Sequence, residues 1–314
     1  MHHGQEIFLF FNRFGNKGFI GIFISNIITI LIIYKTLYII KKENIGSYKE
    51  FIYKIVGKKT IINRIINLIV DSFLLIGFYI MIAGFRAYFS QELKVNSYFA
   101  SCIGAMLCFG IFSKKINGIV KINEILVPII ILLIIILGLV RLNTQDIYLG
   151  DNIPQRNKML TYSTIYAGYN SITLIPMLIS LKKYTKNKKD IVLVAGLCGL
   201  VLTTLGIIIF LLLNTIKLYN VEIPIIYIAS EIGIIFKYLY GLVILTAILT
   251  SAVAEGYSFL QNTTKDKNEY KIMNLFICTT SIFISQIGFS KLVNILYPFF
   301  GYLSIAQVLL IFLR

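Results

Sequence analysis

Long apolar runs separated by short polar breaks are the feature that most limits what this chain can become. A helix needs about 20 mostly apolar residues to cross roughly 30 Å of hydrocarbon. Backbone polar groups find no water inside a bilayer, so such runs are expected to be helical. We therefore predict an all-α polytopic membrane protein, a single transmembrane domain over residues 1–314. The predicted spans are residues 18–41, 62–92, 97–113, 117–141, 159–182, 190–214, 235–261, 271–288 and 290–313.

Composition excludes several classes of protein. Only 14% of the residues are charged, against roughly 25% in ordinary soluble domains, which argues against a soluble enzyme or a nucleic-acid-binding protein. The 2 histidines, His2 and His3, lie at the very start, and the 4 cysteines lie inside apolar runs, where they behave as small apolar residues. We expect no enzymatic activity and no cofactor beyond a possible sodium ion. The lipid bilayer is the expected surrounding, and the oligomeric state is left open.

The net charge of +16 indicates orientation in a membrane. Lys and Arg concentrate in the connections that follow the first, third, fifth and seventh predicted spans, and at Arg314. These connections hold about twice as many basic residues as the opposite side, and the basic side of a membrane protein is cytoplasmic. We predict a multi-pass protein of the cytoplasmic membrane with a cytoplasmic C-terminus.

Three segments are irregular. Residues 5–15 are apolar but only half long enough to span, and residues 223–236 are broken by Pro and Gly and predict a re-entrant or surface helix. The run at 159–182 carries Gly168, Tyr169, Asn170 and Ser171 in its middle, with Pro176 beyond. Such residues favour an unwound stretch that lines a polar cavity, although an ordinary kinked helix has the same signature. Ten elements with an irregular first and sixth suit a transporter of two inverted five-helix repeats, here residues 1–141 and 159–314.

The run at 235–261 contains a candidate cation site. At about 3.6 residues per turn, the Ala247 carbonyl and the hydroxyls of Thr250 and Ser251 lie on adjoining parts of one helix face. Three hard oxygens in this arrangement suit a small cation such as sodium. Alternatively, the hydroxyls bond back to carbonyls of their own helix or hold two helices together.

Short motifs in a fixed order run along essentially the whole chain, and with them the sequence resembles the YkvI-type bacterial membrane proteins. That group lies within the amino acid, polyamine and organocation transporter superfamily, which has the LeuT-type fold. The resemblance implies a ten-helix secondary carrier of the bacterial cytoplasmic membrane, with its substrate unassigned. The motifs are Gln5-Glu6-Ile7, Phe10-Phe11-x-Arg13-Phe14-Gly15-x-Lys17-Gly18, Asn123 with Val127-Pro128, Tyr169-Asn170, and Tyr297-Pro298 to Gly301-Tyr302.

The resemblance also bears on the cation site. Ala247, Thr250 and Ser251 are similar to the second sodium site of that superfamily, on the eighth helix of the fold. The other half of such a site comes from a Gly-rich stretch before the pair Gln5-Glu6, and that stretch is absent here. We therefore expect a first helix that is truncated at its N-terminal half, through a gene-model error or a real loss.

Ionisable groups within spans are costly and are treated as functional hypotheses. Glu6 could bind a substrate ammonium or carry a proton, or it could be an exposed acid beside a helix end. Glu255 and Asp71 are proton or gating candidates, with interfacial contacts as the alternative for Glu255. Arg86 could gate by pairing or could reach toward the membrane surface. Tyr79 could face substrate or simply pack.

The sequence thus predicts a cation-coupled secondary transporter, driven by Na⁺ or H⁺, for an amino acid or a small amine-like solute. The alternatives are a sensor or assembly subunit that keeps the fold without transport, and a truncated inactive family member. The expected substrate-binding residues are Gln5, Glu6, Tyr79, Gly168, Tyr169, Asn170 and Ser171.

Overall fold

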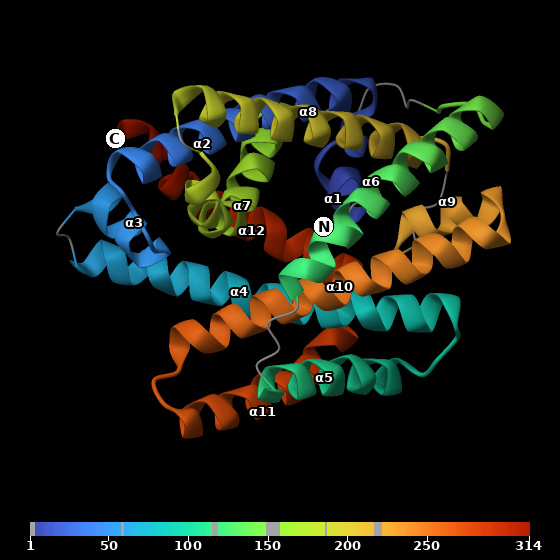
Figure 1. Ribbon diagram of the computed structural model, residues 1–314. Coiled ribbons are helices and arrows are strands. Elements are labelled where there is room, and N and C mark those ends of the chain that lie inside the picture. The colour runs from blue at the N-terminus through green and yellow to red at the C-terminus, as the bar shows by residue number, and fades with distance from the viewer. Residues whose placement is uncertain (1–3, 58–59, 115–118, 149–157, 186, 217–221) are drawn as a thin grey trace. The chain divides into compact units, whose positions relative to one another are not determined.

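The computed structural model describes residues 4–57, 60–114, 119–148, 158–185, 187–216 and 222–314. Within these ranges the chain is helical and contains no strand. Figure 1 shows the order of the helices. They are α1 Gln5–Phe10, η1 Asn12–Lys17, α2 Gly18–Lys42, α3 Tyr48–Val56, α4 Thr60–Glu92, α5 Ser97–Lys114, α6 Ile119–Thr144, α7 Met159–Ser180, η3 Leu181–Tyr184, α8 Lys188–Leu213, α9 Pro224–Ile232, α10 Ile234–Thr263, α11 Lys267–Ile284, η4 Ser285–Ile287 and α12 Phe289–Leu313.

The predicted spans coincide with the long helices of the structure. In the described part of the chain, 7 helices are long and apolar enough to cross a membrane. The helices α7 and α11 also lie where spans were predicted, but they fall outside this set. Polar residues explain the difference, because α11 opens with Lys267, Asn268 and Glu269 and α7 has a polar centre. An all-α polytopic membrane protein is therefore confirmed, and residues 117 and 118 of one predicted span lie outside the described residues.

The chain folds into two compact units. Unit 1 comprises residues 1–8, 71–148 and 211–294, and unit 2 comprises residues 9–70, 149–210 and 295–314. Each unit therefore draws on both halves of the sequence. Most of α4, α5, α6, α9, α10 and α11 belong to unit 1, whereas α2, α3, α7, most of α8 and most of α12 belong to unit 2.

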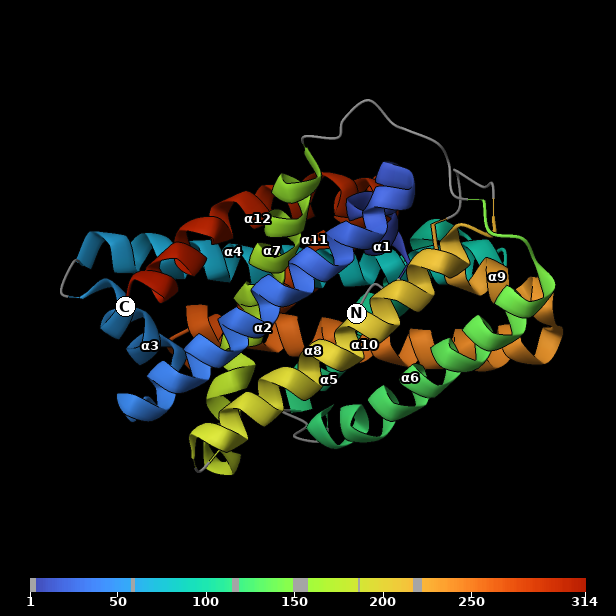
Figure 2. The ribbon, with the colours of Figure 1, turned by 90° about the horizontal axis from the view of Figure 1, so that it is seen from above.

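In unit 2, α2 packs between neighbours that come from later in the sequence. Figures 1 and 2 show α2 and α8 side by side, and Gly199 of α8 faces Ile30 of α2 so closely that a Cβ there would collide with the isoleucine. At the end of α2, Lys54 Nζ of α3 lies 3.0 Å from Glu43 Oε2. This hydrogen bond and the charge of Lys54 lower the pKa of Glu43. The apolar core of this region joins α2, α3, α7 and α8 through Ile33, Leu37, Ile40, Phe51, Ile175 and Ile191.

In unit 1, α5 packs along α11 and α10 packs against α6 and α9. The hydroxyls of Ser101 and Ser285 lie 2.8 Å apart and fix the end of the α5 and α11 pair. The predicted break in residues 223–236 is confirmed, because α9 begins at Pro224 and ends before Gly233, where α10 follows. One side of α9 is buried, through Ile225, Ile226, Ile228 and Ala229.

The predicted unwinding of the run at 159–182 is wrong, because α7 is helical through residues 167–171 and past Pro176. The polar side chains bond to their own helix instead of replacing lost backbone bonds. Asn170 Nδ2 donates to the Tyr166 carbonyl at 2.8 Å, and Ser171 Oγ donates to the Gly168 carbonyl at 2.6 Å. Gly168 serves close packing, since a Cβ there would lie 3.1 Å from the Gly301 carbonyl oxygen of α12.

Candidate functional site

The site residues predicted from the sequence divide between the two units. Unit 2 contains the four residues of α7, and unit 1 contains the others. In unit 2 these are Gly168, Tyr169, Asn170 and Ser171, and in unit 1 they are Gln5, Glu6, Asp71, Tyr79, Ala247, Thr250, Ser251 and Glu255.

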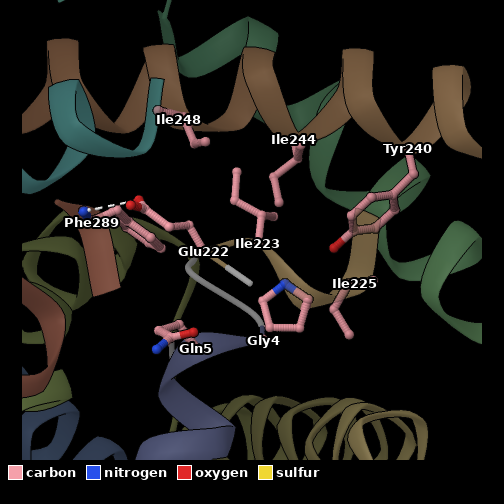
Figure 3. Close-up of a pocket in the computed structure, with 10 residues that line it drawn as sticks. Gly4, Gln5, Glu222, Ile223, Ile225, Tyr240, Ile244, Ile248 and Phe289 are labelled. Carbon is pink, nitrogen blue, oxygen red and sulfur yellow. Dashed lines mark hydrogen bonds between the residues drawn. The ribbon is translucent and has the colours of Figure 1, made fainter. Parts of the chain in front are cut away.

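Unit 1 contains a small cavity between the start of α1, the start of α9, α10 and the first residue of α12 (Figure 3). Its volume is about 20 Å³, enough for one water-sized molecule. An amino acid does not fit into it. The lining residues are Gly4, Gln5, Glu222, Ile223, Pro224, Ile225, Tyr240, Ile244, Ile248 and Phe289. Among the predicted substrate residues, Gln5 lines this cavity.

Tyr240 is a polar residue of this cavity that sequence reasoning missed. Its side chain is 1% exposed, and its hydroxyl has no hydrogen-bond partner among the described residues. In Figure 3 the hydroxyl points toward the other lining residues. A buried hydroxyl without a partner costs roughly 1–3 kcal/mol, which favours a water or a ligand group beside it. A single Tyr in an apolar run gives no sequence signal for such a role.

Glu222 connects the cavity to two other elements. Its Oε2 accepts a hydrogen bond of 3.1 Å from the Phe289 backbone N–H, drawn as a dashed line in Figure 3. Its Oε1 lies 3.7 Å from Arg86 Nη1. Arg86 is thus paired with an acid, and a gating role for it stays a prediction.

The antiparallel helices α4 and α10 place two of the three proton or gating candidates of unit 1, Asp71 and Glu255, on one interface. Asn262 Nδ2 donates to Asp71 Oδ1 at 2.9 Å, so Asp71 has a polar partner. Further along, Gly77 faces the Glu255 carboxyl group. The Oε2 atom of Glu255 is buried without a hydrogen-bond partner among the described residues. The interface continues through the pairs Gly84 with Ile248 and Tyr88 with Gly241.

The predicted cation ligands lie together on α10 but bond to each other. Thr250 and Ala247 are both buried, and Thr250 Oγ1 donates to the Ala247 carbonyl at 3.1 Å. Ser251, next in the chain, is only half-buried. Back-bonding of this kind was the alternative considered from the sequence. The hydroxyl keeps its lone pairs, so a cation site here stays a prediction.

Tyr79 is buried, and its hydroxyl lies 2.8 Å from Thr280 Oγ1 of α11. This bond ties α4 to α11. The substrate role that was considered for Tyr79 also stays a prediction.

In unit 2, Tyr169 lies in an aromatic stack. Its ring centroid is 5.8 Å from that of Phe10 and 4.7 Å from that of Tyr297, with nearly parallel planes in both cases. Tyr166 packs edge-on against Phe10 at 5.3 Å. Phe10 and Tyr297 belong to the motifs that carry the family resemblance, but sequence reasoning did not connect them to Tyr169.

A second, larger cavity of unit 1 is polar. It measures about 600 Å³ and is lined by Arg141, Gln145, Tyr148, Thr215, Ile216, Tyr227 and Glu231. Arg141 is 5% exposed; its Nε donates to Thr215 Oγ1 at 3.0 Å and its Nη2 to Glu231 Oε2 at 2.5 Å. Tyr227 donates to the same carboxylate at 2.9 Å, and this bond raises the pKa of Tyr227. Sequence reasoning missed this cluster because Arg141 stands at the end of a predicted span, where a basic residue is ordinary.

No protein-family model matches the chain. Among curated proteins, the chain is 27% identical over 315 residues to the "Uncharacterized membrane protein YkvI" of Bacillus subtilis (strain 168). The match covers 97% of this chain and 88% of that protein. A likeness that extends over nearly the whole of both chains supports a YkvI-type membrane family for this protein.

Proposed function

We propose that this protein is a secondary transporter of the bacterial cytoplasmic membrane that couples a Na⁺ or H⁺ gradient to the movement of an amino acid or a small amine-like solute. The observation that carries the proposal is the way in which the two predicted repeats are divided between the two units. Carriers built from repeats work by movement of one helix bundle against another around a central site. A chain with this organisation suits that mechanism.

The division is the same for the second, third and fourth helices of each predicted repeat. In the first, α2 belongs to unit 2, whereas most of α4 and all of α5 belong to unit 1. In the second, α7 and most of α8 belong to unit 2, whereas α10 and α11 belong to unit 1. The second, third and fourth helices of one repeat therefore share a unit with their counterparts in the other, whereas the fifth do not, because α6 belongs to unit 1 and most of α12 to unit 2. This correspondence of matching helices supports a LeuT-type arrangement of five plus five helices.

The solute contacts proposed for unit 1 are at the start of α1. Gln5 and Glu6 are 6% and 8% exposed, and Gln5 lines the small cavity. A carboxylate is the natural partner of a solute ammonium, and an amide can bond to either end of an amino acid. Because the cavity is only about 20 Å³, binding requires a conformation in which this region is wider.

Thr250 provides the first test, with the full chain purified and reconstituted into proteoliposomes. Uptake of a panel of labelled amino acids and amines is measured under imposed Na⁺ or H⁺ gradients. If Thr250, Ser251 and the Ala247 carbonyl hold sodium, Thr250→Ala should lower Na⁺-driven uptake at least tenfold, because a hard-oxygen ligand is lost.

Thr246→Ala is the matched control. Its hydroxyl bonds back to the Leu242 carbonyl at 2.7 Å, about one turn earlier on the same helix. Unchanged Na⁺ dependence in Thr250→Ala would remove the sodium site from the proposal. Absence of uptake across the whole panel under both gradients would contradict transport itself.

A second candidate function is a sensor or assembly subunit on the same fold. The hydrogen bond from the Thr250 hydroxyl to the Ala247 carbonyl favours it, because the bond satisfies both groups within the helix and does not require a bound ion. Solute binding to the purified protein without gradient-driven uptake would support this alternative.

A further inference from the structure

The position of Glu255 along α10 corresponds to the hydrocarbon depth of a bilayer when the helix is centred in it. Helix α10 runs from Ile234 to Thr263, and Glu255 is between six and seven residues beyond its midpoint, which corresponds to about 10 Å along the axis. With α10 centred in the bilayer, this places the carboxyl group inside the roughly 15 Å half-thickness of the hydrocarbon.

The space for this carboxyl group is created by a glycine. Gly77 of α4 faces Glu255, and a Cβ at Gly77 would collide with the carboxylate oxygens. The Oε2 atom is buried in this contact and has no hydrogen-bond partner among the described residues. The helices α4 and α10 therefore enclose a carboxyl oxygen for which the described residues provide no hydrogen-bond donor.

The groups around the niche supply no counter-charge in the described part of the chain. From α1, the buried acid Glu6 lies within electrostatic range of Glu255. From α4, the acid Asp71 is held by Asn262. From α5, Phe112 packs on Gly256, the residue next to Glu255. The ion pairs Lys54–Glu43, Arg86–Glu222, Arg141–Glu231 and Lys237–Glu92 involve acids other than Glu255.

An unpaired carboxylate at this depth is unfavourable by several kcal/mol. It has to bind a proton or a metal cation. Sodium requires several oxygen ligands around one point, whereas a proton requires a single carboxylate oxygen, and Oε2 is a single buried oxygen without a partner. The geometry favours the proton.

Accordingly, and resting on the proposed transport function, we infer that Glu255 is the proton-carrying residue of the transport cycle and that H⁺ is the coupling ion. One O–H bond forms on the carboxylate when a proton enters from one side of the membrane, and the same bond breaks when the proton leaves on the other side. No electron transfer and no co-reactant is involved. A negative charge on Glu6 disfavours a negative charge on Glu255. Binding of a positively charged solute group at Glu6, at the start of α1, therefore changes how readily Glu255 is protonated.

The first arm of the test does not depend on transport. Infrared spectroscopy of the purified full chain at neutral pH should show the carbonyl band of a buried protonated carboxylic acid, which Glu255→Gln removes. Glu43→Gln is the control, because Lys54 lowers the pKa of Glu43 and keeps it ionised at neutral pH. A band that persists in Glu255→Gln with unchanged intensity overturns the inference.

The second arm measures uptake in proteoliposomes. Glu255→Gln should lower pH-gradient-driven uptake at least tenfold, and Glu255→Asp should restore part of it because it restores an ionisable oxygen. Full pH-gradient dependence in Glu255→Gln refutes the inference and leaves the transport function standing. If the wild-type chain transports no solute, the proposed transport function is wrong, and so is the coupling role of Glu255. The infrared result would then still assign a bound proton to Glu255.

Discussion

At the scale of single residues, glycines decide how closely the helices of each unit approach. Gly301 of α12 is one of the restricted cases, because a Cβ there would lie 2.7 Å from the backbone carbonyl oxygen of Ile165 in α7. A backbone oxygen cannot turn aside as a flexible side chain can. The α7 and α12 contact therefore depends on the missing side chain.

Gly301→Ala should destabilise the protein by about 1–3 kcal/mol, since added volume in a packed interior forces the backbone to shift. Thermal unfolding in detergent measures the effect. Gly196→Ala is the control, because this helical glycine meets no atom within 4 Å in the described structure; it should be neutral or stabilising by up to about 1 kcal/mol through helix propensity. Equal melting temperatures for the two variants would contradict the close contact.

The residue scale also shows why the site could be predicted only in part. Gly168 and Asn170 have the residue types of a helix break and equally those of a tightly packed helix. What decides between them is the facing surface of α12, with Gly301 and Ser304, and a surface that distant in sequence cannot be read from a local motif. Glu255 stands out in the sequence as an acid within a predicted span, but the niche opposite it depends on Gly77 of another helix.

At the scale of elements, α9 is a short helix that is held in place by charged and polar contacts at its ends. Glu231 at its C-terminal end pairs with Arg141 of α6. Just before its N-terminal end, Glu222 faces Arg86 of α4, and the Ile223 N–H donates to Gln91 Oε1 at 3.4 Å. Apolar runs locate such an element in the sequence, but they do not reveal these partners.

We expect Glu231→Gln to destabilise the protein by about 1–3 kcal/mol, because it leaves the Arg141 charge, 7% exposed in its side chain, with a weaker partner. The loss is smaller than for a fully buried pair because Glu231 is 35% exposed. Melting temperatures in detergent test this. In the double variant Arg141→Met with Glu231→Gln, most of the loss should disappear. A single variant as stable as the wild type would show that Arg141 does not need this carboxylate.

Glu231 of this ion pair also affects the pKa of Tyr227. Tyr227 donates to Glu231, and the carboxylate raises the pKa of the phenol by favouring its protonated form. In Glu231→Gln the pKa of Tyr227 should therefore fall toward its ordinary value. The pKa falls because the variant lacks the carboxylate that favours the neutral phenol. In the wild type, the hydrogen bond from Tyr227 to Glu231 persists as the pH rises, until the raised pKa of Tyr227 is passed. Ultraviolet difference titration against a Tyr227→Phe variant isolates the signal, and an unchanged pKa would contradict the hydrogen bond.

At the scale of the whole molecule, the positions of the helices in the sequence were predictable, but their assignment to the two units was not. Hydropathy located α2, α4, α5, α6, α8, α10 and α12, because each is a long apolar run. It gave no sign that residues 1–8, 71–148 and 211–294 form one unit. Such grouping depends on side-chain packing between distant segments, whereas hydropathy reports only local solubility in lipid.

Orientation is tested at the same scale. The excess of Lys and Arg in alternate connections predicts a cytoplasmic C-terminus. A green fluorescent protein fused after Arg314 should fluoresce in intact cells, and alkaline phosphatase at the same place should be inactive. Phosphatase inserted after Lys94, in the opposite set of connections, should be active. Active phosphatase at the C-terminus would reverse the topology.

The interleaved units also constrain how the protein is made. Synthesis runs from the first residue onward, and unit 1 draws on residues up to 294 while unit 2 draws on residues up to 314. Neither unit has all of its segments until almost the entire chain has left the ribosome. Early helices must wait in the bilayer for late partners, which is the condition under which incomplete packing persists longest. The early helices therefore contact lipid in place of their later helix partners for most of the synthesis of the chain.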